Sequence, residues 1–81
     1  MEVHETKTRV KELRTQAKMT QQQLAVQVHV SVRTIISIEK EQYAPSLMLA
    51  YRIAETFGVT IEDLCCLKEN KALEDERRED L

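Results

Sequence analysis

Three residues near the middle of the chain could hydrogen-bond to a charged partner together. Arg33, Ser37 and Lys40 are spaced by four and three residues, and Ile36 stands beside them. On a helix, residues with this spacing share one face. A guanidinium, a hydroxyl and an ammonium group supply hydrogen-bond donors that suit phosphates and other anions. The spacing therefore predicts a short, polar and partly basic face on one helix.

The sequence contains no arrangement typical of an enzyme or of a metal site. It has no nucleophile–base pattern and no glycine-rich phosphate loop. Cys65 and Cys66 are adjacent, while His4 and His29 are far apart, which does not predict a tetrahedral metal site. Adjacent cysteines without a disulfide framework suit a reducing compartment. We predict no enzymatic activity, no cofactor and no metal; the two cysteines pack at the end of the domain or, alternatively, sense redox state.

Charge is distributed unevenly along the 81 residues. Residues 1–40 contain seven basic and four acidic residues, a balance of +3, and residues 41–81 contain five basic and ten acidic residues, a balance of −5. A locally basic half can face phosphates although the whole chain has a net charge of −2. No apolar run approaches the ~18 residues of a membrane span, and the N-terminus lacks the apolar stretch of a signal peptide. These features predict a cytoplasmic protein.

Apolar periodicity and capping residues predict an all-α domain, and one Gly and one Pro leave little turn material for a sheet. The predicted helices cover residues 6–18, 20–29, 32–40 and 46–57, and a fifth begins at residue 60. Their predicted N-caps are Thr20, Ser31, Ser46 and Thr60, and Gly58 ends the fourth helix. Residues 6–66 are thus predicted as one domain, whose core is thin. The highly charged residues 67–81 are predicted as a helical extension or a disordered tail.

Only His29, Val30 and Ser31 separate the second and third predicted helices. Two short helices joined by such a turn form a helix-turn-helix, whose second helix fits the major groove of double-stranded DNA. The stretch from Val10 to Leu64 resembles the lambda-repressor and Cro type of this domain, also called the xenobiotic-response-element family. The matching residues are Leu13-Arg14, Met19 to Ala25, Val30-Ser31, Thr34-Ile35, Ile38-Glu39, Tyr43 to Leu47, Ile53-Ala54 and Phe57 to Val59.

The resemblance implies a five-helix lambda-repressor-like fold in a prokaryotic or phage-encoded transcription regulator that binds a palindromic operator as a homodimer. It implies that Gln21 reaches a phosphate and that Arg33 reads a base, since a guanidinium pairs with guanine. The whole predicted DNA-binding set is Gln21, Gln22, Val32, Arg33, Thr34, Ile36, Ser37, Lys40 and Tyr43. Alternatively, the face of the third helix is simply solvated, Ile36 is an ordinary exposed aliphatic residue, and Gln22 is a helix former.

Two charged residues, Arg14 and Glu39, fall within apolar stripes of the first and third predicted helices. The resemblance implies that they form an ion pair, so Arg14 belongs to the scaffold rather than to the DNA contacts. His29 and Glu41 occupy turn positions where the family often has Gly. A non-Gly residue in a left-handed conformation costs about 1 kcal/mol or more. Either these turns have a different shape here, or some stability is lost.

Helix 46–57 has an apolar arc wider than one core face requires. The helix is therefore either central in the fold or shared between the core and a dimer interface. For the second case the predicted interface residues are Leu49, Ile53, Phe57, Leu64 and Leu67. The acidic stretch from Glu69 to Leu81 suggests a protein partner, and the alternative function is an antitoxin or a partner-binding regulator.

Overall fold

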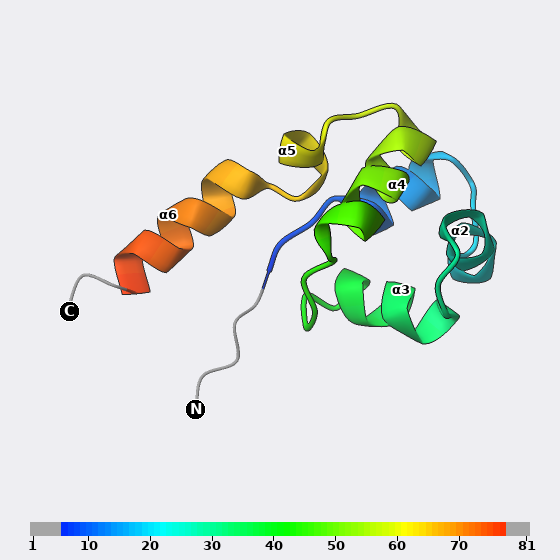
Figure 1. Cartoon of the computed structure of the whole chain (residues 1–81), viewed down its shortest axis with the longest axis horizontal. Helices are drawn as coiled ribbons and strands as arrows, with labels where there is room; N and C mark the ends of the chain where they lie inside the picture. Colours follow the sequence, from blue (N-terminus) through cyan, green and yellow to red (C-terminus); the bar gives the residue numbers. More distant parts are fainter. Residues whose placement is uncertain (1–5, 78–81) are drawn as a thin grey trace.

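The computed structural model of the chain describes residues 6–77, and these residues contain helices and no strand. The predictions for residues 1–5, including His4, and for the end of the tail at residues 78–81 lie outside the described residues. The helices, shown in Figure 1, are α1 (Val10–Gln16), α2 (Gln21–Val28), α3 (Val32–Glu39), α4 (Leu47–Phe57), α5 (Ile61–Leu64) and α6 (Leu67–Arg77). The predicted all-α class is confirmed, and within the described residues the charged extension forms the helix α6, one of its two predicted alternatives.

Side-chain caps fix where four of the helices begin. Thr20 and Gln23 form the predicted capping box, in which the Gln23 amide donates to the Thr20 hydroxyl at 3.0 Å and the Thr20 amide to the Gln23 side chain at 2.8 Å. The hydroxyls of Ser31, Ser46 and Thr60 accept in the same way at the starts of α3, α4 and α5. These caps satisfy backbone donors that have no partner within the helix. All four predicted N-caps are confirmed.

The first helix is shorter than the prediction of residues 6–18. The amide of Thr6 donates to the Glu41 carbonyl at 3.3 Å, and that of Arg9 to the Leu64 carbonyl at 2.8 Å. Residues 6–9 therefore run as a non-helical segment bonded to other parts of the fold, and α1 begins at Val10. At the other end, Lys18 adopts a left-handed conformation with φ 57°, which stops the helix.

The core lies between α1, α2, α3, α4 and α5, and α4 is its central element (Figure 1). Leu49 is 7% exposed, and Ile53 and Leu64 are completely buried within this single chain. The prediction that these three residues form a dimer interface is therefore corrected, because a side chain already enclosed by its own fold offers no surface to a second copy. Of the other two predicted interface residues, Phe57 packs partly buried against the core, and Leu67 is 47% exposed.

Besides Lys18, four residues in the described part of the chain have the left-handed backbone that glycine accepts most easily: His29, Glu41, Gly58 and Cys66, the last with φ 50°. His29 has φ 65°, Glu41 has φ 62° and Gly58 has φ 69°. The turns at His29 and Glu41 therefore keep the shape that the family usually builds with Gly, and the non-Gly residues bear the conformational cost. Gly58 ends α4 as predicted, with its amide bonded back to the carbonyl of Glu55.

The C-terminal extension is the helix α6, which contains no buried residue. Figure 1 shows it projecting away from the core beyond α5. Its side chains include both basic and acidic groups, and Lys71 pairs with Asp75 at 2.7 Å on its exposed surface. None of the helices in the described part of the chain is long and apolar enough to cross a membrane.

Candidate nucleic-acid interface

The turn between α2 and α3 holds the two helices in a fixed arrangement. His29 ends α2 in the left-handed conformation, and the amide of Val30 donates to the Ala25 carbonyl at 3.0 Å. Ser31 then caps α3, and its hydroxyl also lies 3.2 Å from that of Thr34. Leu24 of α2 and Ile35 of α3 are fully buried, so the two helices pack on the same core. This arrangement leaves one face of α3 available for a ligand.

The exposed face of α3 contains the polar residues that the spacing predicts. Ile35 and Ile38 are buried on the opposite face. Arg33 and Lys40 are exposed, and Ile36 and Ser37 are half-buried between them. Val32 packs partly against the core, so less of it is available than of Arg33. A helix that is anchored on one side and presents donors on the other has the form needed to enter a DNA groove.

A shallow concavity of about 380 Å³ lies on this side of the molecule. It is lined by Arg33, Thr34 and Ser37 of α3 and by Gln42 and Tyr43 of the loop that follows. Four of these five residues belong to the predicted DNA-binding set. The sequence analysis missed Gln42, whose position depends on the left-handed turn at Glu41 and on its own amide, which donates to the Ser37 carbonyl at 3.0 Å.

Two glutamines of α2 lie in different surroundings. The side-chain amide of Gln21 donates to the Glu39 carboxylate at 3.0 Å and is used within the fold. Gln22 is exposed and lines a separate hollow of about 480 Å³ between the end of α1 and α2, together with Met19 and Val26. The structure therefore does not bring Gln22 to the concavity on α3, which favours its alternative interpretation as a helix former.

The predicted ion pair between Arg14 and Glu39 is present and bidentate. Arg14 Nε lies 2.6 Å from Glu39 Oε2 and Nη2 lies 3.1 Å from Oε1, while Nη1 donates to the Met19 carbonyl at 2.8 Å. The side chains are 12% and 4% exposed. Burial alone would raise the pKa of Glu39, but the hydrogen bonds from Arg14 and Gln21 outweigh it and hold the pKa below its usual value. Arg14 is thus a scaffold residue connecting α1 to α3.

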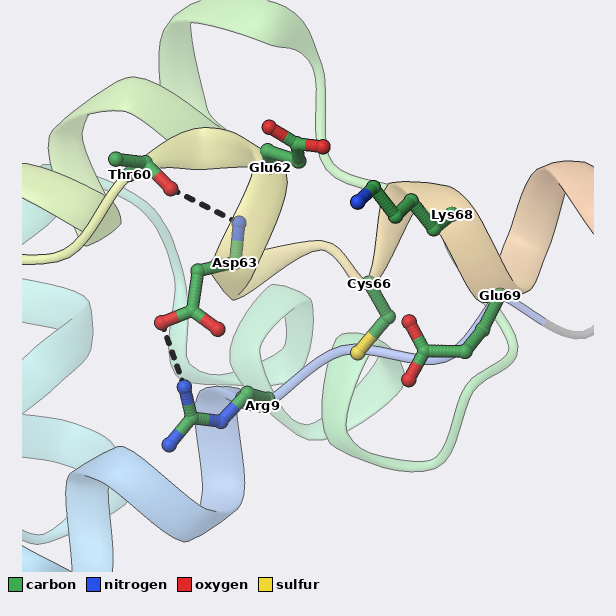
Figure 2. A pocket seen from close by; sticks show the side chains of 7 residues that line it. All are labelled: Arg9, Thr60, Glu62, Asp63, Cys66, Lys68 and Glu69. Atoms are coloured by element: carbon green, nitrogen blue, oxygen red, sulfur yellow. Dashed lines mark hydrogen bonds and ion pairs between the residues drawn. The ribbon is translucent and has the colours of Figure 1, made fainter.

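A third hollow, of about 340 Å³, lies at the junction of α5 and α6 and is shown in Figure 2. It is lined mainly by charged side chains, among them Arg9, whose guanidinium lies 2.6 Å from Asp63, and it includes the thiol of Cys66. Burial raises the pKa of both Cys65 and Cys66, which disfavours the reactive thiolate. Residues 6–77 contain no group of three or more His, Cys, Asp or Glu placed to hold a metal ion.

Comparison with known proteins places this geometry in a family. A helix-turn-helix family matches residues 10–64. An uncharacterized HTH-type transcriptional regulator of Archaeoglobus fulgidus is 46% identical over 68 residues, which is 84% of this chain and 96% of the relative. An uncharacterized HTH-type transcriptional regulator of Methanocaldococcus jannaschii is 50% identical over 58 residues, 72% of this chain and 88% of the relative. Another, of Bacillus subtilis, is 41% identical over 63 residues, 78% of this chain and 96% of the relative.

The match spans α1 to α5 and so includes the whole described helix-turn-helix with the core that supports it. The chain belongs to the helix-turn-helix family of DNA-binding transcriptional regulators, of the lambda-repressor and Cro type.

Proposed function

We propose that this protein is a cytoplasmic, sequence-specific regulator that binds a palindromic operator as a homodimer, with α3 in the major groove of each half-site. The observation that carries the proposal is the concavity formed by Arg33, Thr34, Ser37, Gln42 and Tyr43 on a helix that is anchored from behind. Buried Ile35 and Ile38 fix the rotation of α3 about its own axis. A helix held in this way presents its donors to base edges without first having to become ordered.

Base readout is assigned to the exposed side of α3. Arg33 lies in the first turn, where a helix entering the groove meets the bases, and a guanidinium can pair with O6 and N7 of guanine. Ile36 is half-buried and offers an apolar surface that suits the methyl group of thymine. Ser37 is close enough to Arg33 to share the same concavity and can reach a base or a phosphate.

Phosphate contacts are assigned to the two ends of the motif. Because the Gln21 side chain is bonded to Glu39, its contribution comes from its backbone amide at the N-terminus of α2, where the helix dipole favours an anion. Lys40 and Tyr43 are exposed at the end of α3 and in the following loop. Contacts of this kind orient a protein on DNA without reading its sequence.

The test is a fluorescence-anisotropy titration with a duplex from the protein's own promoter region, repeated over a series of salt concentrations. Affinity should fall steeply with salt, because bound phosphates release counterions. Arg33→Ala should weaken binding to the preferred site by about 1–3 kcal/mol and reduce discrimination between sites, whereas Lys40→Ala should weaken all duplexes equally and reduce the salt slope by about 1. Lys68→Ala, a matched change at an exposed position of α6, is the control. Undetectable binding at low salt, or binding that does not depend on salt, would refute the proposal.

A second candidate function is an interaction module, favoured by α6 with its exposed charges and lack of any buried side chain. In this case the helix would bind a partner protein, as in an antitoxin. A pull-down comparing the wild type with a variant in which Glu74, Asp75 and Glu76 are changed to Gln separates the two functions. If both proteins capture the partner equally, the second candidate function is contradicted.

A further inference from the structure

Residues 6–9, which we call the N-terminal strap, run between the end of α3 and the start of α6 (Figure 1). On one side, the amide of Thr6 donates to the carbonyl of Glu41 at 3.3 Å. On the other side, the amide of Lys7 donates to Asn70 Oδ1 at 3.0 Å, and Asn70 Nδ2 donates to the carbonyl of Lys7 at 2.9 Å. The strap is thus bonded to the turn after α3 and to α6 at adjacent residues, Thr6 and Lys7.

Asn70 uses its whole amide group in these contacts. In addition to the two bonds with Lys7, its Nδ2 donates to the carbonyl of Cys65 at 2.6 Å. One side chain therefore joins three segments: the strap, the end of α5 and the first turn of α6. Asn70 is half-buried, whereas its neighbours Glu69 and Lys71 are exposed. It also lies outside residues 10–64, so the shared helix-turn-helix does not account for it.

The packing of α6 does not explain this arrangement by itself. The helix has 11 residues and buries none of them. A helix of this length is marginal in isolation, because forming its first turn is unfavourable and few residues follow to compensate. The hydrogen bonds of Asn70 therefore do more for the strap, which they hold in place, than for the hydrophobic core.

The other end of the strap meets the part of the fold that faces DNA. Glu41 closes α3 in a left-handed conformation, and Gln42 and Tyr43 follow it directly and line the concavity beside Arg33. Movement of the strap away from Glu41 would loosen this turn and with it the loop wall of the concavity. The hydrogen bond from the Thr6 amide to the Glu41 carbonyl connects the strap to this turn.

We infer that Asn70 is a positioning residue for the DNA-binding face, acting through the N-terminal strap on the turn after α3. The inference rests on the proposed function and adds a role for the C-terminal helix. Arg9 makes the effect local: its guanidinium lies 2.6 Å from Asp63, as Figure 2 shows, and its amide is bonded to Leu64. These contacts keep the strap attached to α5 when Asn70 is removed, so the fold should remain while the turn loosens.

The experiment compares the full-length wild type with Asn70→Ala, and uses Ala72→Asn as the matched control that places an amide on an exposed position of the same helix. DNA affinity is measured at a temperature at which circular dichroism shows all proteins to be folded. Asn70→Ala should weaken binding by about 2- to 30-fold, the range observed for residues that act through their neighbours. The slope of affinity against salt should not change, because no phosphate contact is removed. Amide exchange at Thr6 and Gln42 should become faster.

Asn70→Ser gives a second, milder test, because its hydroxyl can still donate and accept a hydrogen bond but cannot make all three bonds of the Asn70 amide group. It should bind with an affinity between those of the wild type and Asn70→Ala, and it decides the matter if Asn70→Ala does not fold. If the wild type binds DNA and both variants bind it as tightly as the wild type does, the inference is overturned while the proposed function stands. A changed salt slope would also overturn it, since Asn70 would then act near a phosphate. A wild type that fails to bind refutes the proposed function, and the inference with it.

Discussion

Glu39 lies where α1, α2 and α3 meet, and it accepts hydrogen bonds from Arg14 and Gln21. The carboxylate is almost enclosed, with 4% of the side chain exposed. A buried charge is tolerated when every part of it has a partner, and removing one partner leaves the other charge uncompensated. The two hydrogen-bonded neighbours therefore explain why acidic and basic residues stand in stripes that are otherwise apolar.

This pair should give the protein an acid-sensitive stability. The pKa of Glu39 in the folded chain is below its usual value, which is about 4.3 in an unfolded peptide. The ion pair therefore stabilises the fold fully above that pH, and this stabilisation is lost as the pH falls through the lower, folded-state pKa. Glu39→Gln should reduce the free energy of unfolding by roughly 3 kcal/mol at neutral pH and should flatten the acid side of the stability profile.

Urea denaturation between pH 7 and pH 3 measures this effect. Glu12→Gln is the control, because Glu12 also has a lowered pKa through its pair with Arg9, but that pair is open to solvent. Exposed pairs contribute little to stability. If the Glu39→Gln profile runs parallel to that of the wild type across the acid range, the ion pair does not control acid stability.

The helix ends show which features of these elements can be predicted from the sequence. A cap is a local feature, because its side chain bonds to a backbone amide three residues further along the chain. The short sequence around each cap is therefore enough to locate the start of its helix, as at Thr20, Ser31, Ser46 and Thr60. The start of α1 is not local, because residues 6–9 are held out of the helix by Glu41, Leu64 and Asn70, which are distant in the sequence. No short-range pattern contains that information.

The left-handed helix ends predict opposite effects of glycine at nearby positions. His29→Gly should raise the free energy of unfolding by about 0.5–1 kcal/mol, because it relieves the cost of φ 65° and part of that gain is offset by greater freedom in the unfolded chain. Gln27→Gly, in the last turn of α2, should lower it by up to about 1 kcal/mol. Gly58→Ala should also destabilise the protein, although an added Cβ meets no atom within 4 Å, because φ remains at 69°.

Thermal or urea unfolding of the three variants checks this prediction. The variants at Gln27 and His29 carry the same new residue two positions apart, so any general effect of glycine on the unfolded chain is shared. Equal destabilisation by His29→Gly and Gln27→Gly would mean that the turn at His29 is not strained. The turn at Glu41 does not allow the same comparison, because the Glu41 carbonyl also accepts the Thr6 amide and a change there would alter two interactions.

The interface prediction at α4 shows that an apolar stripe alone does not predict which of its residues will be buried by their own chain. The width of the apolar arc is real, but a stripe does not show how many neighbours will cover it. Ile53 is enclosed by its own chain, while Leu47, Met48 and Tyr51 are 71%, 59% and 50% exposed. Burial here depends on how α5 and α1 pack around α4, a long-range property. The exposed residues of α3 are easier to predict, since their exposure follows from the helical period and two buried isoleucines.

At the scale of the whole molecule, a dimer on DNA imposes a geometric requirement. Two recognition helices must enter successive major grooves on one side of the duplex, about 34 Å apart. The chain measures 42 × 25 × 21 Å, so two copies placed side by side across a short axis can meet this spacing. A small domain with a thin core also gains stability from a partner.

The exposed apolar residues of α4 are the best candidates for this contact between copies. Leu47 and Met48 stand four and three residues before Tyr51, so each of them neighbours Tyr51 on the surface of the first turns of the helix. Single exposed apolar residues are common on surfaces, but three large ones close together on one helix are typical of an interaction site. Leu67 is exposed as well, but its neighbours Lys68 and Glu69 are charged.

Tyr51→Glu should therefore convert the proposed homodimer to monomers, because a carboxylate buried between two copies would have no compensating charge. Sedimentation velocity over a range of protein concentrations measures the change. Leu67→Glu is the control that introduces the same charge at an equally exposed leucine of α6, and it should leave the dimer intact. Tyr51→Glu should also lose affinity for a palindromic duplex while retaining weak binding to a half-site, since the α3 face of each copy is unaltered. If Leu67→Glu dissociates the protein and Tyr51→Glu does not, the copies meet at α6 instead.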